Sequence, residues 1–212
     1  MNRIRALLVD DHPVVRAGYR LLLESTAEIE VIGETDSGEL ACRHFVDLKP
    51  DIVIMDLSLR GMGGLEATRR ILARDPEARV LVFSMHEDTM FAEQSLAAGA
   101  SGYLTKSSAP RTLIEAARQI AAGGRYLDPE LAQRLAFRQS GGRAEPFRNL
   151  STREFEILCL LARGETTADI AARLSLSSKT VANYATRIRT RLGVATTAEL
   201  TRLAIRHGIV DA

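Results

Sequence analysis

The short apolar run Ile52–Met55, which ends at the acid Asp56, constrains the fold of this chain more than any other segment. A run of this length is typical of a strand that is buried on both faces, as in a parallel sheet. Asp56 then follows the carboxyl end of that strand, which is where open α/β sheets bind their ligands. An unpaired carboxylate is costly to bury, so Asp56 either caps the next turn or faces a cation.

The same strand pattern recurs along the first part of the chain and alternates with helical patterns. Strands are expected over 4–9, 30–34, 52–55, 79–84 and 101–106, and helices over 12–23, 37–48, 63–72, 89–98 and 108–122. Five strands that alternate with five helices predict an α/β fold with a doubly wound, five-stranded parallel sheet.

Polar residues follow four of these strands: Asp10 and Asp11, then Asp56, Ser84 and Lys106. Because parallel strands end at one edge of the sheet, we expect these side chains to lie close together. Three carboxylates favour a divalent cation, and Mg²⁺ takes oxygen ligands while keeping waters. Phosphoryl transfer needs positioning and charge neutralisation, which makes Asp56 a candidate nucleophile. Taken singly, each residue could instead be a helix cap or a surface charge.

Leu8–His12, Asp56, Ser84 and the pair Tyr103 and Lys106 together resemble the flavodoxin-like receiver domain of two-component response regulators. The resemblance covers residues 1–122. It implies that Asp56 accepts a phosphoryl group from a sensor histidine kinase.

The resemblance also implies a role for each residue around Asp56. Asp11 and Asp56 would bind Mg²⁺, with Asp10 acting mainly through water and the backbone carbonyl of Ser58 completing the site. Lys106 would pair with the phosphoryl oxygens. Ser84 would move to hydrogen-bond the phosphoryl group, and Tyr103 would turn inward behind it.

Three positions depart from the receiver pattern. Arg60 stands where receivers usually have proline, and Gly63 where many have an acid. Ser107 follows Lys106 in place of a common cis proline, and a cis bond before a residue other than proline costs about 3–4 kcal/mol. The conformations of the loop after Asp56 and of the loop after Lys106 are therefore left open. Arg60 is either solvated or faces the kinase.

Residues 123–147 are predicted to be a linker. Residues 138–146 are polar, contain Gly, Ser and Pro, and have no periodicity, which is typical of a flexible connection. A short helix over 129–137 could belong to either neighbouring domain.

Residues 148–212 are predicted to form an all-α domain of four helices. Two capping boxes, Ser151–Glu154 and Thr196–Glu199, begin the first and fourth helices. The second helix, over 167–174, is joined to the third, over 178–192, by a tight turn of helix-turn-helix length. This part of the chain, from residue 123 on, has a net charge of +5, whereas residues 1–122 have −4.

The third helix has an apolar stripe opposite a basic face without acids. Val181, Ala185, Ile188 and Leu192 form the stripe. Short polar side chains can read base edges in a major groove while Lys and Arg hold phosphates. The predicted DNA contacts are Lys179, Thr180, Ala182, Asn183, Thr186, Arg187, Arg189 and Arg191.

Residues 150–154, Ile170–Ala171, 178–184 and 191–194 are similar to the LuxR/NarL-type helix-turn-helix. The resemblance implies that the third helix enters the major groove, that base contacts fall on Ala182, Asn183 and Thr186, and that the fourth helix helps to form a dimer. Because Ala182 and Asn183 differ from common family residues, the operator cannot be inferred from relatives.

The sequence therefore predicts a cytoplasmic transcriptional regulator that is switched by phosphorylation of Asp56. It would bind promoter DNA as a homodimer, with RNA polymerase as a further candidate partner. Its sequence contains no apolar run that could span a membrane.

Two alternatives remain open. A metal-dependent phosphohydrolase would need a general acid near Asp56, but position 58 is Ser, so turnover chemistry is not expected. A regulator or adapter that works without phosphorylation would be favoured by failure to bind Mg²⁺.

Overall fold

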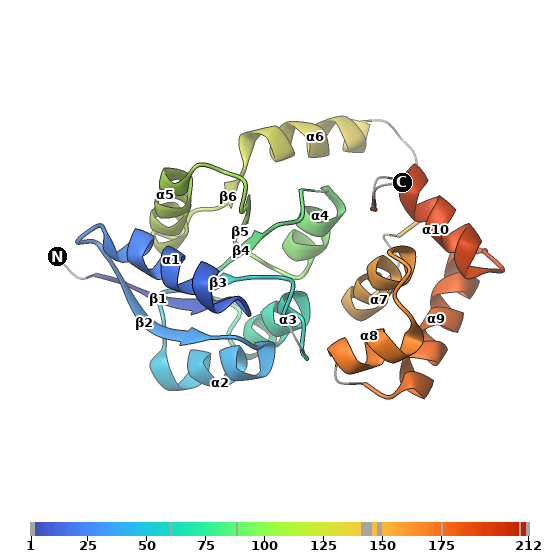
Figure 1. Ribbon diagram of the computed structural model, residues 1–212. Helices are drawn as coiled ribbons and strands as arrows, with labels where there is room; N and C mark the ends of the chain where they lie inside the picture. The colour runs from blue at the N-terminus through green and yellow to red at the C-terminus, as the bar shows by residue number, and fades with distance from the viewer. Residues whose placement is uncertain are drawn as a thin grey trace. The chain divides into compact units, whose positions relative to one another are not determined.

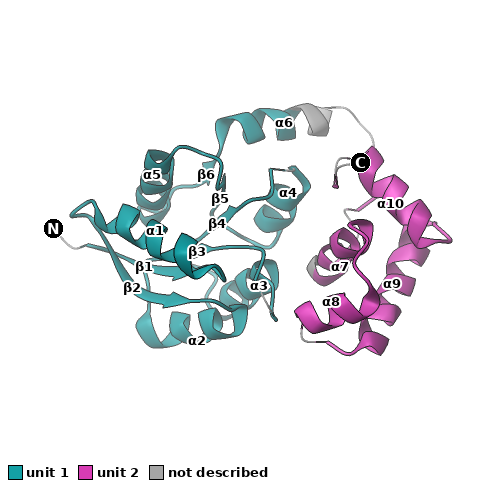
Figure 2. Cartoon of the chain, viewed as in Figure 1, with its two compact units in different colours: residues 1–137 teal, residues 138–212 magenta. Residues whose placement is uncertain are grey.

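The structure, a computed structural model, describes residues 3–59, 61–87, 89–140, 146–147, 150–174, 176–207 and 209–210. The chain divides into two compact units, residues 1–137 and 138–212 (Figure 2). Three sequence expectations fall partly or wholly outside the described residues: the loop residue Arg60, most of the polar segment 138–146, and Ser175 in the predicted turn. The predicted boundaries at 122 and 147 stay predictions.

The first unit is built on a parallel sheet whose strands follow the order β2-β1-β3-β4-β5-β6 (Figure 1). The strands are β1 (Ile4–Val9), β2 (Ile29–Thr35), β3 (Ile52–Met55), β4 (Val80–Ser84), β5 (Gly102–Thr105) and β6 (Tyr126–Leu127). The direction of winding reverses between β1 and β3, which is the switch point where such sheets bind ligands.

Strand β6 adds a sixth strand to the five that were predicted. Gly102 pairs with Tyr126, and Tyr103 with Leu127. A Cβ atom on Gly102 would lie 2.4 Å from the carbonyl oxygen of Tyr126, so a glycine is required for this approach. Two residues are too few to show a strand period, and for this reason the sequence pattern placed them in the linker.

Helices cover both faces of the sheet. On one face, alternate strand residues such as Leu8 and Ile54 pack against α1 (Pro13–Glu24) and α5 (Pro110–Ala121). On the other, Leu7 and Val53 pack against α2 (Gly38–Leu48) and α3 (Gly64–Arg74). Helix α4 (Thr89–Ala97) contacts α3 and β5. Because successive side chains of a buried strand point to opposite faces, each face of the sheet needs a layer of helices, and this gives the doubly wound arrangement.

Helix α6 (Pro129–Ser140) follows β6 directly. Oδ1 of Asp128 accepts the backbone N–H groups of Glu130 and Leu131, which caps the first turn. Leu131 is buried, and Arg134 donates to the carbonyl oxygen of Glu87 over 3.1 Å. The beginning of α6 is therefore packed as part of the first unit.

The second unit contains α7 (Thr152–Ala162), α8 (Thr167–Leu174), α9 (Ser178–Leu192) and α10 (Thr197–Arg206). Ser151 and Glu154 form the predicted capping box of α7. Helix α9 ends at Gly193, whose φ of 65° lies in the left-handed region that favours glycine. Phe155, Ile170, Val181, Ile188 and Leu200 are buried between the helices.

Within the described parts of the chain, no helix is both long and apolar enough to cross a membrane.

Candidate functional site

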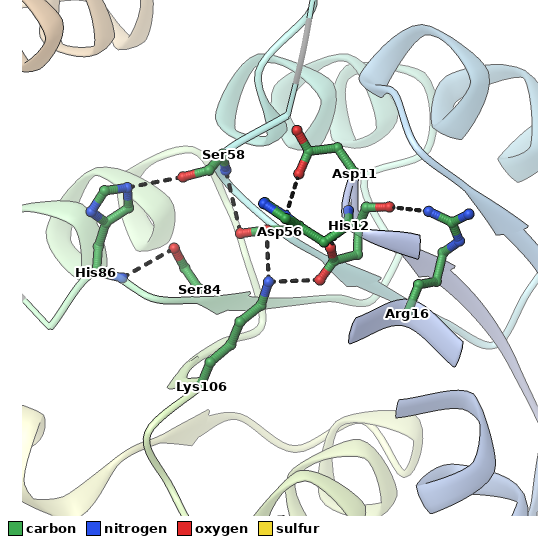
Figure 3. Close-up of polar contacts among 9 residues, drawn as sticks. Asp11, His12, Arg16, Asp56, Ser58, Ser84, His86 and Lys106 are labelled. Atoms are coloured by element: carbon green, nitrogen blue, oxygen red, sulfur yellow. Dashed lines mark hydrogen bonds and ion pairs between the residues drawn. The ribbon is translucent and has the colours of Figure 1, made fainter. Parts of the chain in front are cut away.

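Three carboxylates and one amine meet beyond the carboxyl ends of β1, β3 and β5 (Figure 3). Asp10 and Asp11 follow β1, Asp56 follows β3, and Lys106 follows β5. Asp10 and Asp56 are 2% and 3% exposed, so their charges are withdrawn from water. The structure thus brings these four residues together as the strand pattern predicted.

Lys106 joins two of the carboxylates. Its Nζ lies 2.6 Å from Oδ2 of Asp10 and 2.7 Å from Oδ2 of Asp56. Burial raises the pKa of Asp56, the ammonium of Lys106 opposes that rise, and the charge of Asp10 adds to it. Burial disfavours the charge of Lys106, but Asp56 and Asp10 together hold its pKa above the ordinary value. One ammonium is therefore shared by two acids.

Backbone groups hold the carboxylates in place. The N–H of His12 donates to Oδ1 of Asp10 over 2.8 Å, and the N–H of Ser58 donates to Oδ1 of Asp56 over 3.3 Å. Nδ1 of His12 lies 2.7 Å from Oδ1 of Asp11. The short loops after β1 and β3 thus set where each carboxylate points.

The donor set fits a hard divalent cation. Ligand atoms of Asp10, Asp11, His12 and Asp56 all lie within 4.8 Å of one another. Each carboxylate oxygen can accept more than one interaction, so the hydrogen bonds to Lys106 and to the backbone leave lone pairs available. Oxygen-rich sites of this kind suit Mg²⁺.

His86, which the sequence pattern did not single out, lies next to Ser58 and Ser84. Nε2 of His86 lies 3.1 Å from Oγ of Ser58, and its backbone N–H donates to Oγ of the buried Ser84 over 3.3 Å. The ring stacks on Phe91, with centroids 4.0 Å apart. The one available signal was the position of His86 two residues beyond the end of β4.

Tyr103 lies inside the first unit rather than on its surface. It is wholly buried, and its hydroxyl donates to the carbonyl oxygen of His86 over 2.7 Å. The predicted movements of Ser84 and Tyr103, and the role of the Ser58 carbonyl, stay predictions.

Arg16 is a second residue that the sequence did not indicate. It donates from α1 to the carbonyl oxygen of Asp10 over 2.5 Å, and its Nε lies 3.4 Å from a carboxylate oxygen of Glu34. Arg16 therefore fixes the backbone at the beginning of the acidic loop.

The loop after β5 contains Ser107. No cis peptide bond occurs in the described segments, so the chain passes from Lys106 to Ser107 in the trans form. Oγ1 of Thr105 lies 3.0 Å from Oγ of Ser107 and 2.9 Å from Oγ of Ser108.

In the second unit, α9 presents the predicted polar face. Val181, Ala185 and Ile188 are buried, as expected for the apolar stripe. The exposed residues on the other side include Lys179, Ala182, Asn183, Thr186, Arg187 and Thr190. Arg189 is half-buried and donates to the hydroxyl of Thr186 over 3.4 Å.

Arg191 differs from the other predicted contacts. Its guanidinium lies 2.6 Å from Oε2 of Glu154, which is buried at the beginning of α7. Its charge is already engaged within the unit.

Both units match known families. The response regulator receiver domain matches residues 6–118, and the luxR family of bacterial regulatory proteins matches residues 148–204.

Similar whole proteins and structures are also known. The response regulator GacA of Pseudomonas aeruginosa is 40% identical over 211 residues, which are 99% of each chain. A LuxR-family two-component response regulator from Aurantimonas is 46% identical with a TM-score of 0.64, over 66% of this chain and 99% of that one. RcsB of Salmonella enterica, solved on the promoter rprA with phosphomimetic BeF3−, is 26% identical with a TM-score of 0.69, over 95% and 98% of the two chains.

Proposed function

We propose, from the premise that this chain belongs to the LuxR family of two-component response regulators, that Asp56 is its phosphoacceptor. The protein is a transcriptional regulator with a receiver and a LuxR-type DNA-binding domain, and its activity depends on phosphorylation. The observation that carries the assignment of Asp56 is its position between Lys106 and the two acids that follow β1.

In the proposed reaction, Oδ1 or Oδ2 of Asp56 attacks the phosphorus of a phosphohistidine on a sensor histidine kinase. The P–N bond breaks, an aspartyl P–O bond forms, and the histidine nitrogen of the kinase keeps the electron pair. Lys106 neutralises charge on the phosphoryl oxygens, and Ser84 donates a hydrogen bond to one of them. The phosphoryl group carries about −1.5 to −2 of charge, which replaces the single negative charge of the Asp56 carboxylate and spreads over three oxygens.

Asp10, Asp11 and Asp56 would hold Mg²⁺, with the carbonyl of Ser58 as a further oxygen. When bound, the cation supplies positive charge that offsets the repulsion between the carboxylates and the incoming phosphoryl group. The closeness of these carboxylate oxygens in the structure supports this assignment.

On the DNA side, α9 would enter the major groove. Ala182, Asn183 and Thr186 would face base edges, and Lys179, Thr180, Arg187 and Arg189 would contact the phosphates or flank the bases. The exposed face of α9 supports this role.

Phosphorylation would favour a homodimer that places two α9 helices on adjacent half-sites. RNA polymerase is a further candidate partner, and the cytoplasm is the proposed location.

The test is phosphorylation by a small acyl phosphate with Mg²⁺, read by intact mass and by sensitivity to hydroxylamine, which cleaves acyl phosphates. We expect one phosphoryl group on the natural chain and none on Asp56→Asn. Asp51→Asn is the matched control, because Asp51 is exposed and binds the backbone N–H of Arg5 outside the acidic cluster.

The second readout is affinity for a duplex that the natural chain selects from random-sequence DNA. Phosphorylation should raise this affinity in the natural chain and in Asp51→Asn, but not in Asp56→Asn. Equal phosphorylation of the two variants would show that Asp56 is not the acceptor.

A further inference from the structure

The first turn of α7 contacts the ends of both helices of the helix-turn-helix. At one side, Arg153 donates to the carbonyl oxygen of Leu174, the last residue of α8, over 2.9 Å. At the other, Glu154 accepts from Arg191, one residue before the end of α9, over 2.6 Å. We name these four residues the α7 clamp.

Glu154 requires a cationic partner because its carboxylate is buried. Its side chain is 4% exposed, and its Oε2 also accepts the N–H and the hydroxyl of Ser151, each over 2.8 Å. A buried carboxylate is stable only when it is paired and hydrogen-bonded. The beginning of α7 provides the hydrogen bonds, and Arg191 provides the charge.

Arg153 is held equally firmly on the other side. Its other guanidinium nitrogen lies 2.7 Å from a carboxylate oxygen of Glu156, and both side chains are mostly buried. A guanidinium presents its donors in a rigid fork. Arg153 therefore fixes the direction in which it reaches the end of α8.

We infer that Arg191 is a positioning residue for DNA recognition, which acts through Glu154 to set the angle of α9, rather than a residue that binds a phosphate. This inference rests on the proposal that α9 reads DNA. Base readout requires side chains to be held within hydrogen-bond distance of base edges, so a small rotation of α9 would weaken contacts along its whole face. The clamp opposes that rotation at the carboxyl end of the helix.

Salt dependence separates the two roles of an arginine. A phosphate contact releases a counterion, so its removal makes the slope of log affinity against log salt concentration shallower by about one. A positioning residue contributes no such release. Its removal should instead lower the ratio of affinities for the selected and the scrambled duplex.

The experiment uses the full chain, well below its melting temperature, with a duplex selected by the natural chain and a scrambled duplex of the same composition. We expect Arg191→Gln to lower the affinity ratio by about tenfold, the loss of roughly one good base contact, with an unchanged salt slope. The matched comparator is Arg187→Gln, on the exposed face of the same helix, which should make the slope shallower and change the ratio little.

Two further variants keep the test decisive if Arg191→Gln does not fold. Arg191→Lys preserves the charge and should recover part of the ratio. Glu154→Gln should lower the ratio as Arg191→Gln does, and the double variant should lose less than the two single losses combined, because the residues act as a pair.

A shallower salt slope in Arg191→Gln would assign Arg191 to a phosphate and overturn the inference. A lower melting temperature with an unchanged ratio would reduce the clamp to a stabilising contact and also overturn it. If Asn183→Ala leaves the ratio of an otherwise natural chain unchanged, the proposed role of α9 itself fails, and the inference fails with it.

Discussion

Nζ of Lys106 lies 2.7 Å from Oδ2 of Asp56, and both side chains are almost completely buried. Lys106 is shared with Asp10, so the cluster contains more carboxylate charge than this ammonium can balance. Burial is the main cause of the raised pKa of Asp56, the charge of Asp10 adds to the rise, and Lys106 opposes it. The arrangement suits a site that accepts a cation and a phosphoryl group, and it lowers the stability of the folded receiver.

Asp56→Asn should therefore stabilise the chain while abolishing phosphorylation. The pKa of Asp56 in the folded chain is raised above its ordinary value of 3.8, so its contribution to stability is present below pH 3.8 and is lost as the pH rises through the folded pKa. At pH 7, where the natural carboxylate is buried and ionised, we expect the variant to have a higher free energy of unfolding of the receiver than the natural chain. Urea unfolding of the two chains between about pH 4 and pH 7 tests the sign of the stability difference between them. A variant that is less stable than the natural chain at pH 7 would contradict the prediction.

Lys106→Met should have the opposite effect. Removal of the amine leaves Asp10 and Asp56 buried and close together without the charge that they share, and breaking a buried pair in this way costs about 3–5 kcal/mol. The loss should shrink at acid pH, where a carboxylate can take up a proton. Arg118→Met is the control, because its ion pair with Glu28 is largely exposed and should contribute less than about 1 kcal/mol.

Mg²⁺ should raise the melting temperature of the receiver, and a chelator should reverse the change. The cation should bind the folded cluster of Asp10, Asp11 and Asp56 in preference to the unfolded chain. At a Mg²⁺ concentration one hundred times the dissociation constant, such binding adds about 2.7 kcal/mol to the free energy of unfolding. Calorimetry in Mg²⁺ is compared with NaCl of equal ionic strength. Identical melting curves in the two salts, or an undiminished shift in Asp11→Asn, would reject this cation site.

The sequence predicted the acidic cluster because each of its members directly follows a strand. Parallel strands bring such residues together whatever the loops do, so Asp10, Asp56 and Lys106 could be grouped without a structure. His86 could not, because it reaches Ser58 through the loop after β4, whose path has no periodicity. The pairing of Arg191 with Glu154 joins residues far apart in the sequence and was likewise hidden.

Leu131→Ala tests whether the beginning of α6 belongs to the receiver or to a linker. Leu131 is 3% exposed in the structure, and emptying a buried leucine site costs about 2–5 kcal/mol. Hydrogen exchange of the β5 amides in the full chain should report this loss. Leu21→Ala, at an exposed leucine of α1, should change exchange little. Equal behaviour of the two variants would place α6 in the linker, as the sequence pattern suggested.

Gly64→Ala should disturb the phosphoacceptor, whereas Gly18→Ala should not. A Cβ atom on Gly64 would lie 1.8 Å from the carbonyl oxygen of Asp56, a backbone atom that cannot move without displacing the carboxylate, whereas one on Gly18 meets nothing within 4 Å. We expect Gly64→Ala to lose about 1–3 kcal/mol of stability and to slow phosphorylation by an acyl phosphate, because α3 must move away from the loop after β3. Gly18→Ala, inside α1, should gain about 0.5–1 kcal/mol through helix propensity alone and react at the natural rate. Urea midpoints and phosphorylation rates of the two variants, measured side by side, decide between a steric requirement at Gly64 and a general effect of adding a methyl group to a helix. Natural rates in both would show that the close approach of α3 to Asp56 has no bearing on the reaction.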